Sequence, residues 1–199
     1  MLRVGLTGGI ASGKSSVARL LEQKGAKFVE SDRLAHQLLK KGTPTWKKIV
    51  HAFGEEILDT SKSIDRKKLA KVVFSQPKKL RQLEQIVHPL VIVEIQKWLS
   101  GCQKKKRVEV AVVEVPLLFE KKLERLFDVV VAVTASRKEQ FARWAKKGFH
   151  SRKEILARMK LQMSQSEKAK RADFVVRNSS DKKELKKRVN FLWEELNRF

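Results

Sequence analysis

The sequence predicts an α/β protein in which helices cover a parallel five-stranded sheet. Short valine-rich runs alternate along the chain with longer segments that carry apolar residues at helical spacing, as in βαβ units. One run, 128–133, is apolar at nearly every position, which is typical of a strand buried on both faces. We expect strands over 2–7, 26–30, 108–115, 128–133 and 174–176.

The first expected strand leads into a glycine-rich loop that ends in lysine. Residues 8–15 fit the pattern G-x-x-x-x-G-K-[ST], and apolar residues at helical spacing follow. In such a loop, glycines such as Gly8 and Gly13 let backbone N–H groups turn towards phosphates, and the helix N-terminus adds partial positive charge. Lys14 is then expected to reach the β- and γ-phosphates, and the Ser15 hydroxyl to ligate Mg²⁺. The order of strand, loop and helix favours a nucleoside triphosphate site over a simple glycine-rich turn.

The chain carries a large excess of positive charge. It has 45 lysine and arginine residues against 22 aspartate and glutamate residues, a formal net charge of +23. This excess points to anionic partners such as nucleic acid, an acidic membrane surface or a polyphosphorylated small molecule, although a general effect of host composition also explains it. Basic residues are dense over 137–171, as expected of a segment that closes over phosphates.

Several classes of protein are disfavoured by what the sequence lacks. No apolar run reaches the ~18 residues of a membrane span, and the first residues do not have the pattern of a secretory signal. The single cysteine, Cys102, excludes an internal disulfide and a cysteine metal cluster. We therefore expect a cytoplasmic protein.

Residues 33–100 read as a helical insertion between strands, a natural place for a substrate-binding subdomain. Within it, Pro89 predicts a kink or a fresh helix start after His88. Just before it, Asp32 follows the second expected strand, at the sheet edge where parallel α/β proteins bind ligands. An N-cap role for Ser31 or Asp32 fits equally well. At the end of the third strand, Glu114 is a candidate carboxylate on the Mg²⁺ side of the site.

Helices are also expected over 138–147 and 153–163, separated by Gly148, and at the C-terminus. The C-terminal helix is expected to bury four aliphatic side chains at helical spacing, Leu185, Val189, Leu192 and Leu196.

Several sequence blocks resemble the dephospho-CoA kinases, which transfer the ATP γ-phosphate to the ribose 3′-hydroxyl of dephospho-coenzyme A. The glycine-rich loop opens with the family's Thr-Gly-Gly-Ile, and other blocks follow in the family's order at 88–90, 116–120, 162–163, 167–169 and 171–173. The resemblance implies a single P-loop kinase domain over 1–199, with a helical CoA-binding insertion at 33–100 and a basic helical lid at 137–171.

The resemblance also implies roles for individual residues. Asp32 matches the second aspartate of the family's Asp-Ala-Asp motif, whose other positions are Glu30 and Ser31 here. It would accept or orient the proton of the attacking hydroxyl. Arg143 matches a lid arginine that contacts the ATP phosphates or the transferring group, and Lys147 stands where the next lid arginine is expected. The implied catalytic residues are Lys14, Asp32 and Arg143.

The binding sites implied by the resemblance draw on both halves of the chain. The implied ATP site consists of Gly9, Ala11, Ser12, Gly13, Lys14, Ser15, Ser16, Arg143 and Asn178, with Ser15 on Mg²⁺. The implied acceptor site consists of Thr7, Asp32, His88, Pro116, Leu117 and Arg158. A structural role fits His88 as well, and a solvated helix face fits Arg158, one turn before Gln162. The expected partners are ATP and dephospho-CoA, acting on a monomer or weak homo-oligomer, with no specific nucleic acid.

Three other functions fit parts of the sequence. A nucleic-acid-binding P-loop protein would account for the charge and for the basic run 104–107, but the chain has no recognition-module signature or array of aromatic residues among the basic ones. A regulatory GTPase would need an Asn-Lys-x-Asp segment, which is missing. Another small-molecule kinase would share the loop and the lid, and the family blocks favour dephospho-CoA kinase over it.

Overall fold

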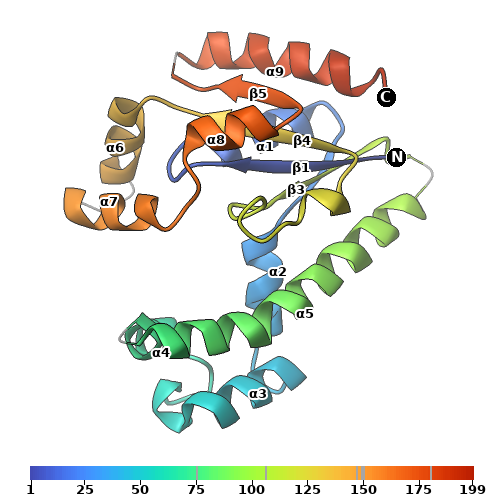
Figure 1. Ribbon diagram of the computed structural model, residues 1–199. Helices are drawn as coiled ribbons and strands as arrows, with labels where there is room; N and C mark the ends of the chain where they lie inside the picture. The colour runs from blue at the N-terminus through green and yellow to red at the C-terminus, as the bar shows by residue number, and fades with distance from the viewer. Residues whose placement is uncertain (75, 106, 147, 149–150, 180) are drawn as a thin grey trace. The chain divides into compact units, whose positions relative to one another are not determined.

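A five-stranded sheet in which every pairing is parallel organises the protein (Figure 1). The computed structural model describes residues 1–74, 76–105, 107–146, 148, 151–179 and 181–199. The strand order is β2-β3-β1-β4-β5. The strands are β1 (Leu2–Gly8), β2 (Lys27–Glu30), β3 (Val110–Glu114), β4 (Val129–Thr134) and β5 (Phe174–Arg177). The predicted α/β class is therefore confirmed.

Helices fill most of the chain between and after the strands. They are α1 (Lys14–Gln23), α2 (Ser31–Leu38), α3 (Pro44–Phe53), α4 (Arg66–Phe74), α5 (Pro77–Gln103), α6 (Arg137–Lys146), α7 (Arg152–Lys160), α8 (Gln165–Arg171) and α9 (Lys182–Leu196). Short 3₁₀ helices cover Glu55–Ile57 and Glu124–Leu126. Within the described part of the chain, no helix has the length and apolar character that crossing a membrane requires.

The chain divides into two compact units. Unit 1 comprises Met1–Glu30 and Leu99–Phe199 and contains the whole sheet. Unit 2 is Ser31–Trp98, close in extent to the insertion expected at 33–100. Its own apolar core joins α3, α4 and the 3₁₀ turn between them, through Ile49, Phe53, Ile57, Leu58, Leu69 and Val73.

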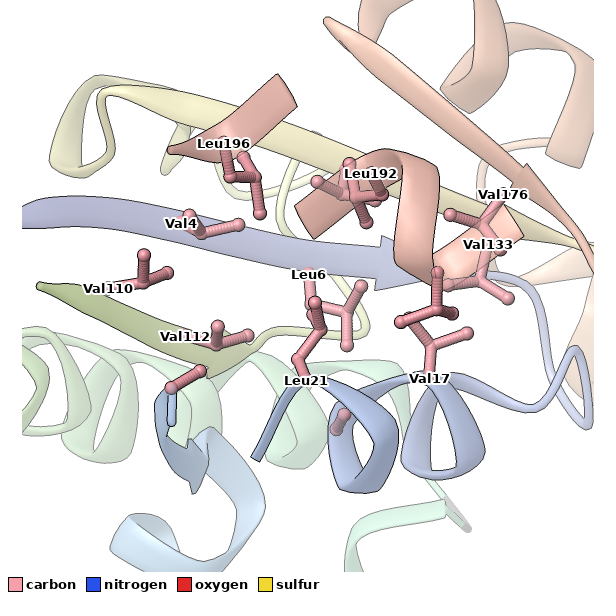
Figure 2. Packing of buried hydrophobic residues seen from close by; sticks show 14 of the residues in the cluster. Val4, Leu6, Val17, Leu21, Val110, Val112, Val133, Val176, Leu192 and Leu196 are labelled. Atoms are coloured by element: carbon pink, nitrogen blue, oxygen red, sulfur yellow. The ribbon is translucent and has the colours of Figure 1, made fainter. Parts of the chain in front are cut away.

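Helices α1 and α9 cover the same face of the sheet in unit 1. Val4 and Leu6 of β1 point to this face together with the valines beside them on β3 and β4. Figure 2 shows Val17 and Leu21 of α1 and Leu192 and Leu196 of α9 in this core. Leu185 and Val189 of α9 are buried in the same cluster. This core fixes the start of α1 beside the carboxyl end of β1, where ligands of parallel sheets bind.

The opposite face of β1 is approached closely by the chain that follows β3. Gly5 faces this side, and a Cβ atom there would lie 2.7 Å from side-chain atoms of both Leu118 and Phe127. Such a distance leaves no room for a side chain, so glycine lets the segment after β3 pack directly on β1.

Two helices in unit 2 bear on alternatives that the sequence left open. Helix α2 begins at Ser31, so Asp32 lies in its first turn, where its charge complements the helix dipole. The helix thus starts directly after β2. Pro89 lies inside α5, which neither ends nor restarts there. Proline costs that helix one hydrogen bond, and packing of Leu83, Ile86 and Val87 against the unit 2 core offsets the loss.

The region expected to form two basic helices contains three. Helix α7 ends at Lys160, short of the predicted 163, because a new helix, α8, begins at Gln165. A capping box starts α8: the Ser164 side chain accepts the Glu167 N–H, and the Glu167 carboxylate accepts the Ser164 N–H. The third predicted strand is also shorter than expected, Val110–Glu114 instead of 108–115. Lys147 lies outside the described residues.

Truncation of Leu21 tests the core between α1 and the sheet. Leu21 is fully buried, so Leu21→Ala should lower the free energy of unfolding by about 2–5 kcal/mol. Leu161→Ala is the matched control, because Leu161 is 72% exposed and its loss should change stability by less than about 0.5 kcal/mol. Chemical denaturation measures both, and equal effects would contradict the packing described.

Candidate functional site

The turn from β1 into α1 depends on two glycines. Gly8 has φ +149°, and a Cβ there would lie 2.2 Å from the carbonyl oxygen of Val133. Gly13 has φ +93°, and a Cβ there would lie 2.0 Å from Nδ2 of Asn178. Both backbone conformation and close packing therefore require glycine. Between them, Ala11 also has a positive φ, +53°, so the loop is tightly wound.

Helix α1 starts at Lys14 and points its first N–H groups at this loop. Gly13 occupies the N-cap position and makes no side-chain capping bond. Ser15 and Ser16 lie in the first turn, and the Ser16 N–H bonds the Gly13 carbonyl at 3.0 Å. The first N–H groups of a helix have no intrahelical partner and carry its positive dipole. The loop and helix together therefore form a cradle for an anion.

The Lys14 ammonium lies inside this cradle. Its side chain is largely buried, and Nζ donates to the carbonyl oxygens of Gly8 at 3.2 Å and Gly9 at 3.1 Å. Nζ also lies 3.9 Å from Oε1 of Glu114, which ends β3 and is buried. A buried cation held beside a carboxylate is positioned to meet phosphate oxygens at the mouth of the loop.

Two side chains from distant segments hold the middle of the loop. Arg143 of α6 donates to the Ser12 carbonyl oxygen at 3.0 Å, and Nδ2 of Asn178 donates to the same oxygen at 2.8 Å. Arg143 also donates to the Asn178 carbonyl at 2.8 Å. The sequence-based expectation was direct ATP contact for both residues. The structure places both against the loop backbone, and direct contact with ATP stays a prediction.

Sequence reasoning missed two glutamines that reach the same loop. Gln140, buried on α6 one helical turn before Arg143, donates to the Ile10 carbonyl. Gln165 of α8 donates to the Gln140 side chain at 3.1 Å. The one-turn spacing between Gln140 and Arg143 was a signal that both face the same neighbour, but nothing local identified that neighbour as the loop.

A second cluster in unit 1 surrounds the Pro116 carbonyl. Oγ1 of the buried Thr7 donates to this oxygen at 3.3 Å, and Nζ of Lys168 donates to it at 2.6 Å. The fully buried Lys168 also pairs with Glu120 at 2.9 Å, and Glu120 accepts the Met163 N–H at 2.8 Å. Burial lowers the pKa of the Lys168 ammonium, while Glu120 opposes that shift. No local pattern in the sequence indicates this pair.

The other expected acceptor residues are spread over both units. Asp32 is exposed in the first turn of α2, and His88 is half-buried within α5, so both belong to unit 2. Leu117 and Arg158 belong to unit 1. Leu117 is half-buried, and the Arg158 guanidinium stacks 5.3 Å above the Trp144 ring, a cation–π arrangement. Because α7 ends at Lys160, Arg158 and Gln162 do not share a helix face as predicted.

The described residues offer few protein ligands for a metal. They contain no group of three or more histidine, cysteine, aspartate or glutamate side chains placed to hold one. Ser15 in the first turn of α1 and Glu114 beside Lys14 are oxygen donors at the cradle. Mg²⁺ carried by a nucleotide takes most ligands from phosphates and water, so this sparse donor set fits Mg²⁺ delivered with ATP.

Comparison with known proteins decides the family. The model of the family described as Dephospho-CoA kinase matches residues 2–184.

The chain belongs to the dephospho-CoA kinase family.

Curated relatives agree over most of their length. The dephospho-CoA kinase of Carboxydothermus hydrogenoformans is 42% identical over 176 residues, covering 88% of this chain and 85% of that protein. The dephospho-CoA kinase of Thermobifida fusca is 38% identical over 198 residues, covering 100% of this chain and 98% of that protein.

Solved structures share the fold. Protein TT1252 from Thermus thermophilus superposes with a TM-score of 0.83 at 33% identity, covering 98% of this chain and 97% of that one. Dephospho-CoA kinase from Campylobacter jejuni gives a TM-score of 0.74 at 26% identity, covering 98% of this chain and 97% of that one.

The buried Lys168–Glu120 pair predicts a measurable stability effect. Lys168→Met leaves the Glu120 carboxylate without its cation and should lower the free energy of unfolding by about 3–5 kcal/mol. Adding Glu120→Gln should recover part of that loss, since a neutral amide can still accept the Met163 N–H. Chemical denaturation of the single and double variants measures this.

The control is Glu124→Gln, which breaks the exposed pair between Arg171 of α8 and Glu124. It should cost less than about 1 kcal/mol. A Lys168→Met effect as small as the control would show that the buried pair does not stabilise this region.

Proposed function

We propose that the protein transfers the γ-phosphate of ATP to the ribose 3′-hydroxyl of dephospho-CoA, giving CoA and ADP. Family membership over residues 2–184 supports the reaction. The observation in the structure that carries it is the phosphate cradle between β1 and α1, with the Lys14 ammonium inside it.

The cradle supplies what phosphoryl transfer requires. This reaction depends mainly on positioning and on stabilising negative charge. The N–H groups at the start of α1 would bind the β- and γ-phosphates, and Lys14 would neutralise charge on the transferring group. Ser15 and Glu114 would hold Mg²⁺, which would neutralise part of the charge on the phosphates. Arg143 joins the proposed lid, 137–171, to the loop through the Ser12 carbonyl.

Asp32 is the proposed positioning group for the acceptor. It matches the family's second motif aspartate and stands two residues after the end of β2. Holding the 3′-hydroxyl in line with the γ-phosphate suffices for such a group, which does not need to be a strong base. The further residues proposed to bind the acceptor are His88 of unit 2 and Thr7, Pro116, Leu117 and Arg158 of unit 1.

Product analysis tests the reaction directly. Purified protein with ATP and Mg²⁺ should form ADP and CoA in equal amounts when dephospho-CoA is present, as followed by mass spectrometry. Lys14→Ala should abolish transfer with the fold intact, because it removes the cation from the cradle. ADP formation that does not depend on dephospho-CoA would contradict the proposal.

Asp32→Asn separates acceptor positioning from nucleotide binding. The variant should lower kcat strongly and leave the Kd for ATP nearly unchanged, because Asp32 is assigned to the acceptor hydroxyl. Steady-state kinetics and ATP titration measure the two effects. Equal turnover in Asp32→Asn and the parent protein would remove Asp32 from the mechanism.

The cytoplasmic location and a monomeric or weakly oligomeric state stay predictions from the sequence.

A further inference from the structure

Two glutamine side chains connect the end of β4 to the phosphate loop. The Gln165 amide bonds the backbone of Ala135 twice, accepting from its N–H at 2.9 Å and donating to its carbonyl at 3.0 Å. Gln165 also donates to Oε1 of Gln140 at 3.1 Å, and Gln140 donates to the Ile10 carbonyl. We call this chain of hydrogen bonds, from Ala135 through Gln165 and Gln140 to Ile10, the glutamine bridge.

The bridge fills the space in which a side chain at position 9 would lie. A Cβ on Gly9 would be 2.8 Å from Cγ of Gln165 and 3.0 Å from Nε2 of Gln140. Unlike Gly8 and Gly13, Gly9 does not have a positive φ. The constraint that the structure shows at this position is therefore the close approach of the two glutamines.

We propose that Gln140 and Gln165 are positioning residues of the nucleotide site, and that Gly9 is required because the glutamine bridge occupies its side-chain space. The inference rests on the proposed nucleotide site. The bond from Gln140 holds the Ile10 carbonyl oxygen on the glutamine side of the loop. A carbonyl oxygen turned towards the cradle would repel phosphate, so fixing it elsewhere prepares the loop for an anion.

The position of Gln165 sets the orientation of both glutamine side chains in the bridge. Gln165 is the first residue of α8, and the capping box of Ser164 and Glu167 fixes that helix start. Two bonds to Ala135 then fix the plane of the Gln165 amide, which leaves Gln140 one orientation that satisfies both of its partners. Gln140 is 2% exposed, so water does not readily replace the bond to Ile10.

Nucleotide affinity of a Gln140 variant tests the bridge. Gln140→Leu keeps the size of the side chain and removes its hydrogen bonds, so we expect ADP to bind about tenfold more weakly. Isothermal titration with ADP alone measures this, and the KM for dephospho-CoA should not change. Gln23→Leu is the matched control, because Gln23 is exposed at the far end of α1. ADP affinity equal to the control would overturn the proposal.

A double-mutant cycle tests the claim about Gly9. Gly9→Ala should weaken ADP binding about tenfold or more in the parent protein, where the new methyl group meets Gln165 and Gln140. In a Gln165→Ala background the same change should cost several-fold less, because the Gln165 contact is gone. Thermal melting of each variant confirms that it is folded at the titration temperature.

An equal fold-loss for Gly9→Ala in both backgrounds would overturn the steric assignment. These titrations use no acceptor, so they are independent of the reaction assigned above. If ADP binding changes as expected but the protein does not phosphorylate dephospho-CoA, the proposed reaction is wrong and the role of the glutamine bridge stands. If the protein phosphorylates dephospho-CoA normally but Gln140→Leu binds ADP with unchanged affinity, the reaction stands and the role of the bridge is wrong.

Discussion

The Ser12 carbonyl oxygen accepts hydrogen bonds from two side chains, Arg143 of α6 and Asn178 after β5, at 3.0 and 2.8 Å. This shared acceptor ties the phosphate loop to two segments that are more than a hundred residues away in the sequence. Gly13 allows the contact, since any Cβ there would collide with the Asn178 amide. The Ile10 carbonyl is held in the same way by Gln140. The shape of the loop is therefore set by side chains from outside it.

Local sequence patterns were sufficient to predict the elements that depend on glycine placement and apolar spacing. The strand before the loop, the loop itself and the helix after it follow from glycine placement and apolar spacing, and all lie close to their predicted positions. The C-terminal helix buries Leu185, Val189, Leu192 and Leu196 as its spacing indicated. Buried strands such as β4 were recognisable because an apolar run leaves few alternatives.

Contacts between distant segments were not predictable in the same way. Lys168 lies within one of the blocks that resemble the family, yet nothing in that block shows that its ammonium is buried against Glu120 and the Pro116 carbonyl. Arg143 was expected at the phosphates, and its bonds to the Ser12 and Asn178 carbonyl oxygens could not be read from its place in the sequence. Pro89 was expected to kink or restart the helix, and α5 continues through it with apolar side chains packed on the unit 2 core. In each case tertiary contacts decide, and a single sequence does not display them.

Side chains outside the phosphate loop hold it in a shape that suits an anion. A crystal structure of the protein with ADP and Mg²⁺ tests this most directly. We expect the bonds to the Ser12 and Ile10 carbonyls to persist, while Nζ of Lys14 leaves the Gly8 and Gly9 carbonyls for the β-phosphate. A loop that gives up its contacts with Arg143, Asn178 and Gln140 on binding ADP would contradict it.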